Sequence, residues 1–192
     1  MIGRYEAIPG WTCADTEALY DAAAANPFVE TIVEVGVAYG RSIAYLAERV
    51  RPGVKVWGVD VWTEHMGGDN LPPDVYARMV AHGSPLDACV AEMTAAGVAD
   101  RVTLLHEKSV DAAKRFADGS IDLVFIDACH EYEPVLEDIR AWLPKVKKDG
   151  ILAGHDYSDV FPGVKRAVEK VFAFGPDARM WAVRGVVWRV RA

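Results

Sequence analysis

The sequence predicts an α/β protein with a Rossmann-like, doubly wound and mostly parallel sheet of seven strands, covered by helices on both faces. Short apolar runs rich in β-branched residues alternate along the chain with helical segments. This alternation is typical of buried parallel strands that are joined by crossover helices. At the C-terminus two strand-like runs flank Arg184-Gly185 with no helix between them, which predicts an antiparallel hairpin.

The elements follow one another at regular spacing. The parallel strands are expected at Thr31–Val37, Val54–Asp60, Val102–His106, Ile121–Asp127 and Ile151–Gly154, and the hairpin strands at Met180–Val183 and Val186–Val190. The helices are expected at Asp15–Ala25, Ser42–Val50, Pro85–Ala96, Val110–Ala117, Pro134–Val146 and Val164–Phe172.

The composition suits a single globular domain over residues 1–192, with residues 1–30 as an N-terminal helical extension. The formal net charge of −7 disfavours nucleic acid and anionic membranes as partners, because both attract basic surfaces. Three widely separated cysteines suit free thiols in a reducing compartment, and the first residues lack the apolar core of a signal peptide. We therefore expect a cytoplasmic protein.

Residues 61–84 interrupt the regular pattern. The part from Trp62 to Ser84 contains several glycines, a Pro-Pro pair and two histidines, and only a short helical stretch. It follows the second strand, at the edge of the sheet where ligands bind, so it is either a lid-like insertion or a surface excursion without a function.

The first strand leads into TIVEVGVAYGRS, residues 31–42, where a buried strand gives way to a turn and a helix start. Glu34 lies inside the apolar strand, where an acid is costly unless another group pairs with it. Gly36 and Gly40 let the backbone approach a ligand, and the helix N-terminus points free N–H groups at the same space. The Gly-x-Gly-x-x-Gly pattern of dinucleotide-binding proteins is absent. The motif predicts a site for a nucleotide or a carboxylate, which Ser42 is placed to meet.

Polar residues also end the second and third strands. Asp60 is placed to accept hydrogen bonds from both hydroxyls of a ribose, or merely to cap a loop. If a ribose binds there, Val61 or Trp62 would flank the adenine. Lys108-Ser109 follows the third strand, where Ser109 is either the N-cap of the next helix or a group beside the adenine.

The fourth and fifth strands deliver acids and imidazoles to the same edge of the sheet. Asp127 ends the fourth strand with His130 three residues later, and the fifth strand ends in His155-Asp156. Carboxylate and imidazole groups together suit a divalent ion such as Mg²⁺, Mn²⁺, Fe²⁺ or Zn²⁺. The alternative is that both histidines are hydrogen-bonded loop residues and bind no metal.

As an ordered set, these motifs resemble class I S-adenosylmethionine-dependent methyltransferases. The segments that carry the resemblance are VEVGVAYGRS, Asp60, IDLVFIDACHEYEPVLEDIRAWLPKVKKDGILAGHDY and GVKRAVEKVF. They are similar to the small O-methyltransferases that include catechol, caffeoyl-CoA and macrolide-sugar enzymes, whose fold the cephalosporin hydroxylase-like proteins share. The resemblance spans about Thr31 to Phe172, and the C-terminal hairpin fits as the last two strands.

The resemblance implies S-adenosylmethionine as the cofactor, with Ser42 on its methionine carboxylate and Asp60 on its ribose. It implies Asp127, His155 and Asp156 as ligands of an optional divalent metal, although metal-dependent relatives end the fifth strand in two acids or an acid and an amide. The implied cofactor-binding residues are Glu34, Gly36, Val37, Ala38, Tyr39, Gly40, Ser42, Asp60, Val61, Trp62, Lys108, Ser109, Asp127 and Ala128.

The implied reaction transfers a methyl group from sulfur to the oxygen of a small molecule or sugar hydroxyl. Asp127, His130 and His155 would be catalytic, with His130 or His155 taking the proton. Catechol-type enzymes carry a lysine where this chain has His130. The expected partner is a small-molecule acceptor, and a homodimer is a candidate assembly.

The sequence disfavours two other functions and leaves two more open. A nicotinamide oxidoreductase is disfavoured by the missing fingerprint and the terminal hairpin. A nucleic-acid methyltransferase is disfavoured by the acidic charge and by IDACHEY at the position where amino-methylating enzymes carry a Pro-Pro motif. A non-catalytic module that binds S-adenosylmethionine, and a metal-dependent hydroxylase or hydrolase on the same fold, remain open.

Overall fold

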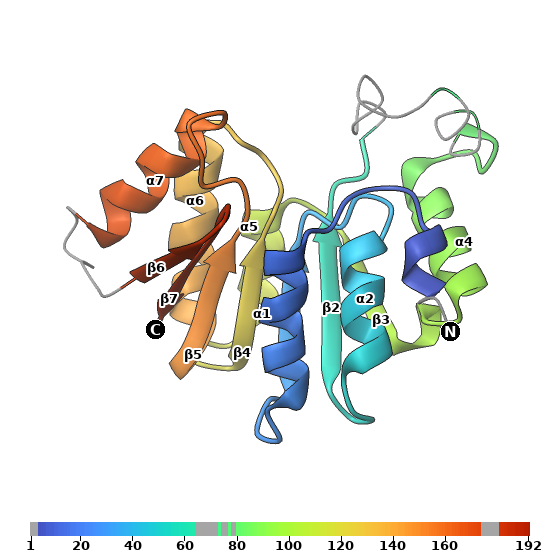
Figure 1. The fold of residues 1–192 in the computed structure, drawn as a ribbon, viewed down its shortest axis with the longest axis horizontal. Coiled ribbons are helices and arrows are strands. Elements are labelled where there is room, and N and C mark those ends of the chain that lie inside the picture. The colour runs from blue at the N-terminus through green and yellow to red at the C-terminus, as the bar shows by residue number, and fades with distance from the viewer. Residues whose placement is uncertain (1–3, 64–72, 74–76, 78–79, 174–180) are drawn as a thin grey trace.

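A computed structural model describes residues 4–63, 73, 77, 80–173 and 181–192, which form a seven-stranded sheet (Figure 1). The strand order is β3-β2-β1-β4-β5-β7-β6, with β1 to β5 parallel and β7 antiparallel to both of its neighbours. The strands are β1 (Thr31–Val35), β2 (Lys55–Asp60), β3 (Val102–His106), β4 (Ile121–Ile126), β5 (Val146–Gly154), β6 (Trp181–Arg184) and β7 (Val187–Arg191). The predicted fold class is confirmed.

Helices cover both faces of this sheet. The α-helices are α1 (Ala14–Ala25), α2 (Arg41–Arg49), α4 (Pro85–Ala96), α5 (Ser109–Ala112), α6 (Tyr132–Trp142) and α7 (Pro162–Phe172). Short 3₁₀ turns occupy Arg4–Ala7, Ala99–Arg101, Ala113–Arg115 and Leu143–Lys145. Apolar side chains of α1, α2 and α4 form one core cluster on the sheet, and those of α5, α6 and α7 form a second. Figure 1 shows α1 and α2 in front of the sheet.

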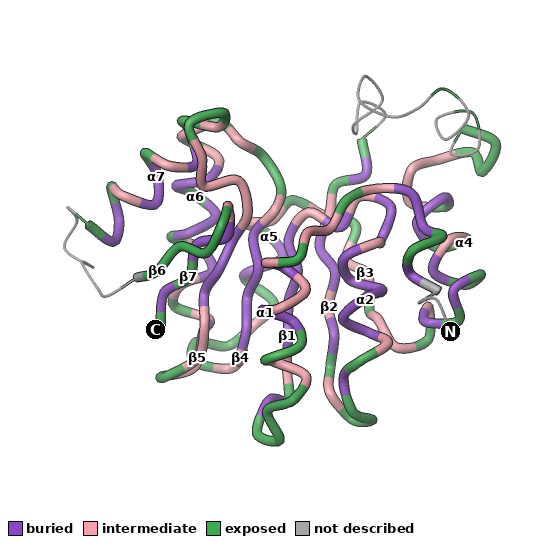
Figure 2. Tube along the Cα trace, viewed as in Figure 1, coloured by how far each residue is buried: buried purple, intermediate pink, exposed green. Residues whose placement is uncertain are grey.

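The alternation of side chains along β1 explains how both clusters form. Ile32 belongs to the first cluster, whereas Val33 and Val35 belong to the second, as expected for successive residues that point to opposite faces. All three are nearly or fully buried, and the central strands are buried along most of their length (Figure 2). The near-continuous apolar runs of the sequence therefore mark strands that are covered on both sides.

Two strands end earlier than the sequence predicts. β1 ends at Val35 rather than Val37, and β4 ends at Ile126 rather than Asp127. The ladder nevertheless continues for one residue, since Gly36 N–H donates to the Val59 carbonyl at 2.8 Å and Asp127 N–H donates to the Val35 carbonyl at 2.7 Å. The carboxyl ends of β1, β2 and β4 are thus tied together where the site residues begin.

The boundary between α6 and β5 also differs from the expectation. The helix expected to reach Val146 ends at Trp142, and β5 begins at Val146 instead of Ile151. Pro144 has no N–H to continue the α-helical hydrogen bonds, so Leu143, still in a helical conformation, begins the 3₁₀ turn that ends at Lys145. Lys147 already belongs to β5, and its Nζ lies 2.9 Å from Asp122 Oδ1 of β4.

The remaining elements keep close to their predicted ranges. The predicted helix Val110–Ala117 is a single α-helical turn, α5, followed by the 3₁₀ turn. Most of the predicted lid from Trp62 to Ser84, and Met180 of the hairpin, lie outside the described residues. None of the helices formed by the described residues is both long and apolar enough to cross a bilayer.

Candidate functional site

A cavity of about 980 Å³ lies at the carboxyl ends of the parallel strands. Fourteen of the seventeen predicted site residues line it: Gly36, Val37, Ala38, Tyr39, Ser42, Asp60, Val61, Lys108, Ser109, Asp127, Ala128, His130, His155 and Asp156. Glu34, Gly40 and Trp62 are not among its lining residues. This is the edge at which open α/β sheets bind ligands.

Glu34 lies beneath the cavity, where it is fully buried and paired. Tyr20 Oη of α1 donates to one of its carboxyl oxygens at 2.5 Å, and Ser42 Oγ donates to the other at 2.6 Å. Burial raises the pKa of Glu34 to about 8, although the two hydrogen bonds oppose this rise. The hydroxyl of Ser42 is therefore engaged by Glu34, and its backbone N–H is the group left for the predicted carboxylate.

The two glycines of the turn are needed for packing inside the protein. At Gly36, where φ is 92°, a Cβ atom would lie 1.9 Å from the Asp127 carbonyl oxygen. At Gly40, with the same φ, a Cβ would lie 2.9 Å from Met93 Cγ of α4. Gly36 thus lets the β1 turn lie against the end of β4, which brings the two halves of the cavity together.

Asp60 organises the wall of the cavity next to this turn. Its Oδ2 accepts a hydrogen bond from Ala38 N–H and its Oδ1 accepts one from Trp62 N–H, both at 2.9 Å. Trp62 is buried, and its indole N–H donates to the Ala38 carbonyl at 2.8 Å. Val61, 39% exposed, is therefore the residue of this pair that faces the cavity.

Ser109, which is partly buried, belongs to a second group of polar residues that line the cavity. The N-cap of α5 is Lys108, not Ser109. Ser109 Oγ accepts a hydrogen bond from the indole N–H of Trp142 at 2.8 Å. Burial raises the pKa of nearby Asp138 to about 6, although its hydrogen bond with Ser109 opposes this rise. Asp138 lines the cavity and was missed from the sequence, because an acid within an amphipathic helix is normally read as solvent-facing.

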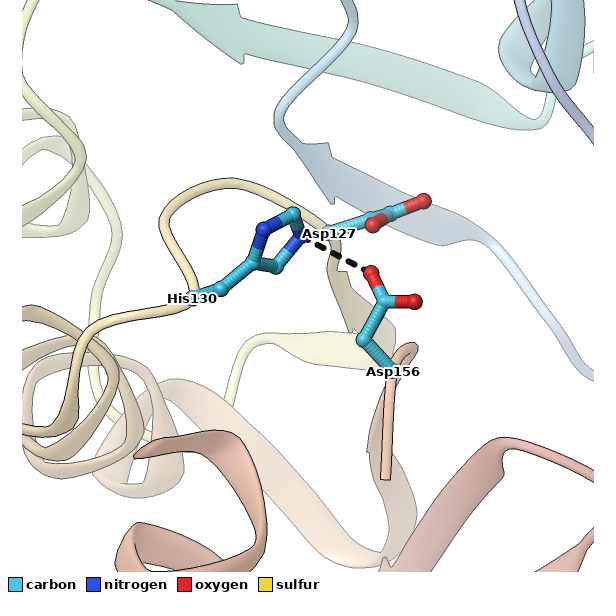
Figure 3. A group of neighbouring side chains, drawn as sticks. All are labelled: Asp127, His130 and Asp156. Carbon is cyan, nitrogen blue, oxygen red and sulfur yellow. Dashed lines mark ion pairs between the residues drawn. The ribbon is translucent and has the colours of Figure 1, made fainter. Parts of the chain in front are cut away.

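The predicted acids and histidines all line the cavity beyond the ends of β4 and β5, and Figure 3 shows three of them, Asp127, His130 and Asp156. His130 Nε2 lies 2.8 Å from Asp156 Oδ2, and His155 Nδ1 lies 3.0 Å from Asp156 Oδ1. Asp156 has a φ of 60°, in the left-handed region that is uncommon for a residue with a side chain. Asp127 is further away, with its Oδ1 3.9 Å from His155 Nδ1.

The pKa values of this cluster are strongly coupled. Burial would raise the pKa of Asp156, but its hydrogen bonds with both imidazoles hold it far below the usual range. Burial would lower the pKa of His155, but Asp156 and the charge of Asp127 raise it to about 9. Hydrogen bonding to Asp156 also raises the pKa of His130, and burial raises that of Asp127 to about 6. A positive charge on His155 at neutral pH follows from these shifts.

The group best placed to hold a cation differs from the predicted one. The ligand atoms of Asp127, His130 and Asp156 all lie within 4.8 Å of one another (Figure 3). This set contains His130 in place of the predicted His155. His155 instead contacts the Cys13 sulfur through Nε2 at 3.4 Å.

The N-terminal segment also lines the cavity, which the sequence did not indicate. Trp11 is 56% exposed there, and Thr12 and Cys13 lie beside it, just before α1 begins. Arg41, the first residue of α2, lines the same cavity and donates from Nη1 to the Gly10 carbonyl at 3.2 Å. The segment has no periodicity that predicts a site. Arg41 did carry a signal, because a cation in the first turn of a helix opposes the dipole.

A family model described as "Methyltransferase domain" matches residues 33–157. The chain belongs to this family. The match runs from β1 to just past β5, so it includes Asp60, Asp127 and the His155-Asp156 pair. Residues 9–13, which line the cavity from the N-terminal side, lie outside it.

The proteins similar to this methyltransferase domain include an uncharacterized bacterial protein and two O-methyltransferases of known structure. The uncharacterized protein y4gI of Sinorhizobium fredii is 28% identical over 130 residues, which is 65% of this chain but only 13% of that protein. CalS11, a TDP-rhamnose 3'-O-methyltransferase of calicheamicin biosynthesis, is 24% identical with a TM-score of 0.59, covering 92% of this chain and 77% of CalS11. An O-methyltransferase from Bacillus cereus in complex with SAH is 16% identical with a TM-score of 0.64, and the match covers 100% of this chain and 87% of that protein.

The two solved structures share the fold of this methyltransferase domain. Its last two strands, β7 and β6, complete the seven-stranded order and form the hairpin that the sequence predicts. In this fold the methyltransferase domain places the β1 turn, Asp60 and the acid–histidine cluster around one cavity.

Proposed function

We propose that the protein is an S-adenosylmethionine-dependent O-methyltransferase that acts on a hydroxyl of a small molecule or sugar. The observation that carries the proposal is one cavity lined by both Asp60 at the end of β2 and the His130–Asp156 pair beyond β4 and β5. Its volume of about 980 Å³ is at the upper end for ligand pockets, which suits a cofactor and an acceptor together.

The wall around Asp60 suits the nucleoside of the cofactor. Each Asp60 oxygen accepts one hydrogen bond from a backbone N–H, of Ala38 or of Trp62. A carboxylate oxygen can accept two, so both oxygens keep one acceptor direction for the hydroxyls of a ribose. The backbone hydrogen bonds fix the orientation of the carboxylate before any ligand arrives, which lowers the cost of binding.

The acid–histidine cluster suits the acceptor side. S-adenosylmethionine supplies an activated methyl group on its sulfonium. The chain must then align the acceptor oxygen and remove its proton. His155, with a pKa of about 9, already holds its proton at neutral pH. His130 is the better proton acceptor, because it is 41% exposed on the cavity and its ring is oriented by Asp156 and by Phe161, whose ring centroid is 4.2 Å away.

A divalent metal is compatible with the same cluster. Two carboxylates and one imidazole, within 4.8 Å of one another, form a donor set that Mn²⁺, Fe²⁺ or Zn²⁺ accepts. Asp127, His130 and Asp156 would hold the ion, and His130 would then be a ligand in place of a proton acceptor. When bound, such an ion orients the oxygens of an acceptor and lowers the pKa of its hydroxyl.

Calorimetry with S-adenosylhomocysteine tests the cofactor assignment. Wild-type protein is expected to bind it, and Asp60→Asn to bind it about 10- to 100-fold more weakly, because the amide offers one acceptor oxygen instead of two. Asp118→Asn is the matched control, since Asp118 is 72% exposed and is not a cavity residue. Unchanged affinity in Asp60→Asn would contradict the ribose assignment, and absence of binding by the wild type would contradict the proposed function.

A further inference from the structure

Two residues of the cavity wall each have a buried polar atom without a hydrogen-bond partner in the described part of the chain. Among the side chains that the structure describes, Thr12 Oγ1 and Arg41 Nε are the only buried nitrogen or oxygen atoms without a hydrogen bond. Both residues line the cavity. Because buried polar groups are nearly always paired in folded proteins, two exceptions in one cavity call for a ligand that satisfies both.

The contacts of Arg41 bring its guanidinium to the N-terminal segment. Nη1 donates to the Gly10 carbonyl at 3.2 Å, two residues before Thr12 in the chain. This hydrogen bond fixes the guanidinium between the first turn of α2 and residues 10–12. Among the described residues Arg41 has no carboxylate within ion-pair distance, so none of their acids neutralises its charge.

The electrostatics of α2 favour an anion at the same place. Arg41 is the first residue of this helix, whose first turn contains no acidic residue. A cation at this position is unfavourable because the helix dipole is positive at its N-terminus. An anion bound there would be attracted both by the guanidinium of Arg41 and by the helix dipole. Two acids of the cavity contact groups other than Arg41: Asp60 accepts hydrogen bonds from backbone N–H groups, and Asp156 pairs with the two histidines.

Ser42, the residue predicted to hold a carboxylate, has its hydroxyl directed elsewhere. Ser42 Oγ donates to Glu34 at 2.6 Å, below the cavity. Among the described residues, the unpaired side-chain donors near the start of α2 are therefore Arg41 Nε and the hydroxyl of Thr12.

We infer that Thr12 and Arg41 form an anion subsite in the cavity, which takes a carboxylate group of a ligand. Arg41 Nε–H and Thr12 Oγ–H donate to the carboxylate oxygens, which satisfies both buried atoms. The carboxylate belongs either to the amino-acid part of the cofactor or to the acceptor. The inference rests on the proposed function and assigns residues to it that the motif did not.

Two ligands that differ only in the amino-acid part separate these sources. S-adenosylhomocysteine carries the carboxylate, whereas 5'-methylthioadenosine keeps the nucleoside and the sulfur without it. If the subsite holds the cofactor, Arg41→Gln should bind S-adenosylhomocysteine about 10- to 100-fold more weakly and 5'-methylthioadenosine as wild type does. Thr12→Val, which removes only the hydroxyl, should show the same selectivity with a loss of about 3- to 10-fold.

A second titration examines the acceptor as the source. Benzoate is titrated into protein saturated with S-adenosylhomocysteine; binding by wild type and not by Arg41→Gln would assign the subsite to the acceptor. Arg51→Gln is the matched control, because Arg51 also donates to backbone carbonyls, those of Pro27 and Val29, and does not line the cavity. Circular dichroism melts of each variant exclude a folding defect.

The outcomes separate the inference from the proposed function. If the substitutions at Arg41 and Thr12 change neither titration, or weaken both nucleosides equally, the subsite does not exist although the cofactor site does. If wild-type protein binds neither nucleoside, the proposed function fails and the subsite fails with it.

Discussion

At the scale of single residues, Glu34 shows what a sequence can and cannot predict. An acid within an apolar strand predicts a buried carboxyl that needs a partner, and Tyr20 and Ser42 provide the hydrogen bonds. Ser42 lies in the same motif and was already a site candidate. Tyr20 could not be identified, because the contact depends on how α1 packs across β1, and no periodicity in the sequence encodes that packing.

The raised pKa of Glu34 makes the stability of the fold depend on pH. Since its pKa in the folded protein is about 8 and its ordinary value is 4.5, the folded state favours the protonated form. The stabilisation is fully present below pH 4.5 and is lost as the pH rises through about 8. Gln at this position stays neutral and keeps a hydrogen bond to each hydroxyl.

Glu34→Gln should therefore gain stability relative to wild type as the pH rises from about 5 to about 8.5, by about 2 to 4 kcal/mol in the free energy of unfolding. Urea titrations at several pH values measure this difference. Glu6→Gln, an exposed position, is the control for the change in charge. A constant difference between Glu34→Gln and wild type across this range would show that Glu34 is not held neutral.

At the scale of elements, the sequence predicted the strands better than their junctions. Apolar runs identify β1 to β5 because these strands are buried on both faces, but the end of α6 depends on Pro144 and on the pairing of Lys147 with Asp122. The turn after β1 was predicted as a place of close approach. The group that lies where a Cβ of Gly36 would be is the backbone of Asp127.

Two glycines with the same backbone conformation test this reading of the turn. Gly36 and Gly53 both have a φ of 92°, but a Cβ at Gly53 meets nothing within 4 Å, whereas one at Gly36 would lie 1.9 Å from the Asp127 carbonyl oxygen. Gly53→Ala should lower the free energy of unfolding by about 1 to 2 kcal/mol, from the left-handed conformation alone. Gly36→Ala adds a clash with the backbone and should lower it by about 3 to 5 kcal/mol.

Urea unfolding of the two alanine variants measures the loss of free energy of unfolding in each. Calorimetry with S-adenosylhomocysteine measures whether the cavity still binds this ligand. Affinity should fall only in Gly36→Ala, because the clash displaces Asp127 from the end of β4. Equal destabilisation by the two substitutions would show that the turn tolerates a side chain, and that Gly36 is present for its conformation only.

At the scale of the whole molecule, the site depends on the topology of the sheet. β4 lies between β1 and β5, so the turn after β1 and the His155-Asp156 pair after β5 flank Asp127 at one edge. This meeting was predictable, because parallel strands of a doubly wound sheet end at the same edge. The contribution of residues 9–13 was not, since an N-terminal segment without periodicity does not reveal where it crosses the sheet.

The choice of histidine for a metal also depends on the whole arrangement. The resemblance implied His155-Asp156 as the ligand pair at the end of the fifth strand. The structure groups His130 with Asp127 and Asp156, and His155 Nε2 lies against the Cys13 sulfur. If this group binds a divalent ion, Mn²⁺ titrated into the protein should bind, and Asp127→Ala or His130→Ala should weaken it more than about 100-fold. His155→Ala removes only a partner of Asp156 and should cost about 10-fold or less.

Calorimetry with Mn²⁺ decides between the two ligand sets, with Asp118→Ala as a control for the loss of a surface acid. A loss at His155 without one at His130 would restore the set predicted from the sequence. No binding of Mn²⁺ by wild-type protein would remove this ion from the site and leave His130, oriented by Asp156 at 2.8 Å, free to act as the general base. Without this ion, the methyl transfer would depend on alignment and proton removal by that base.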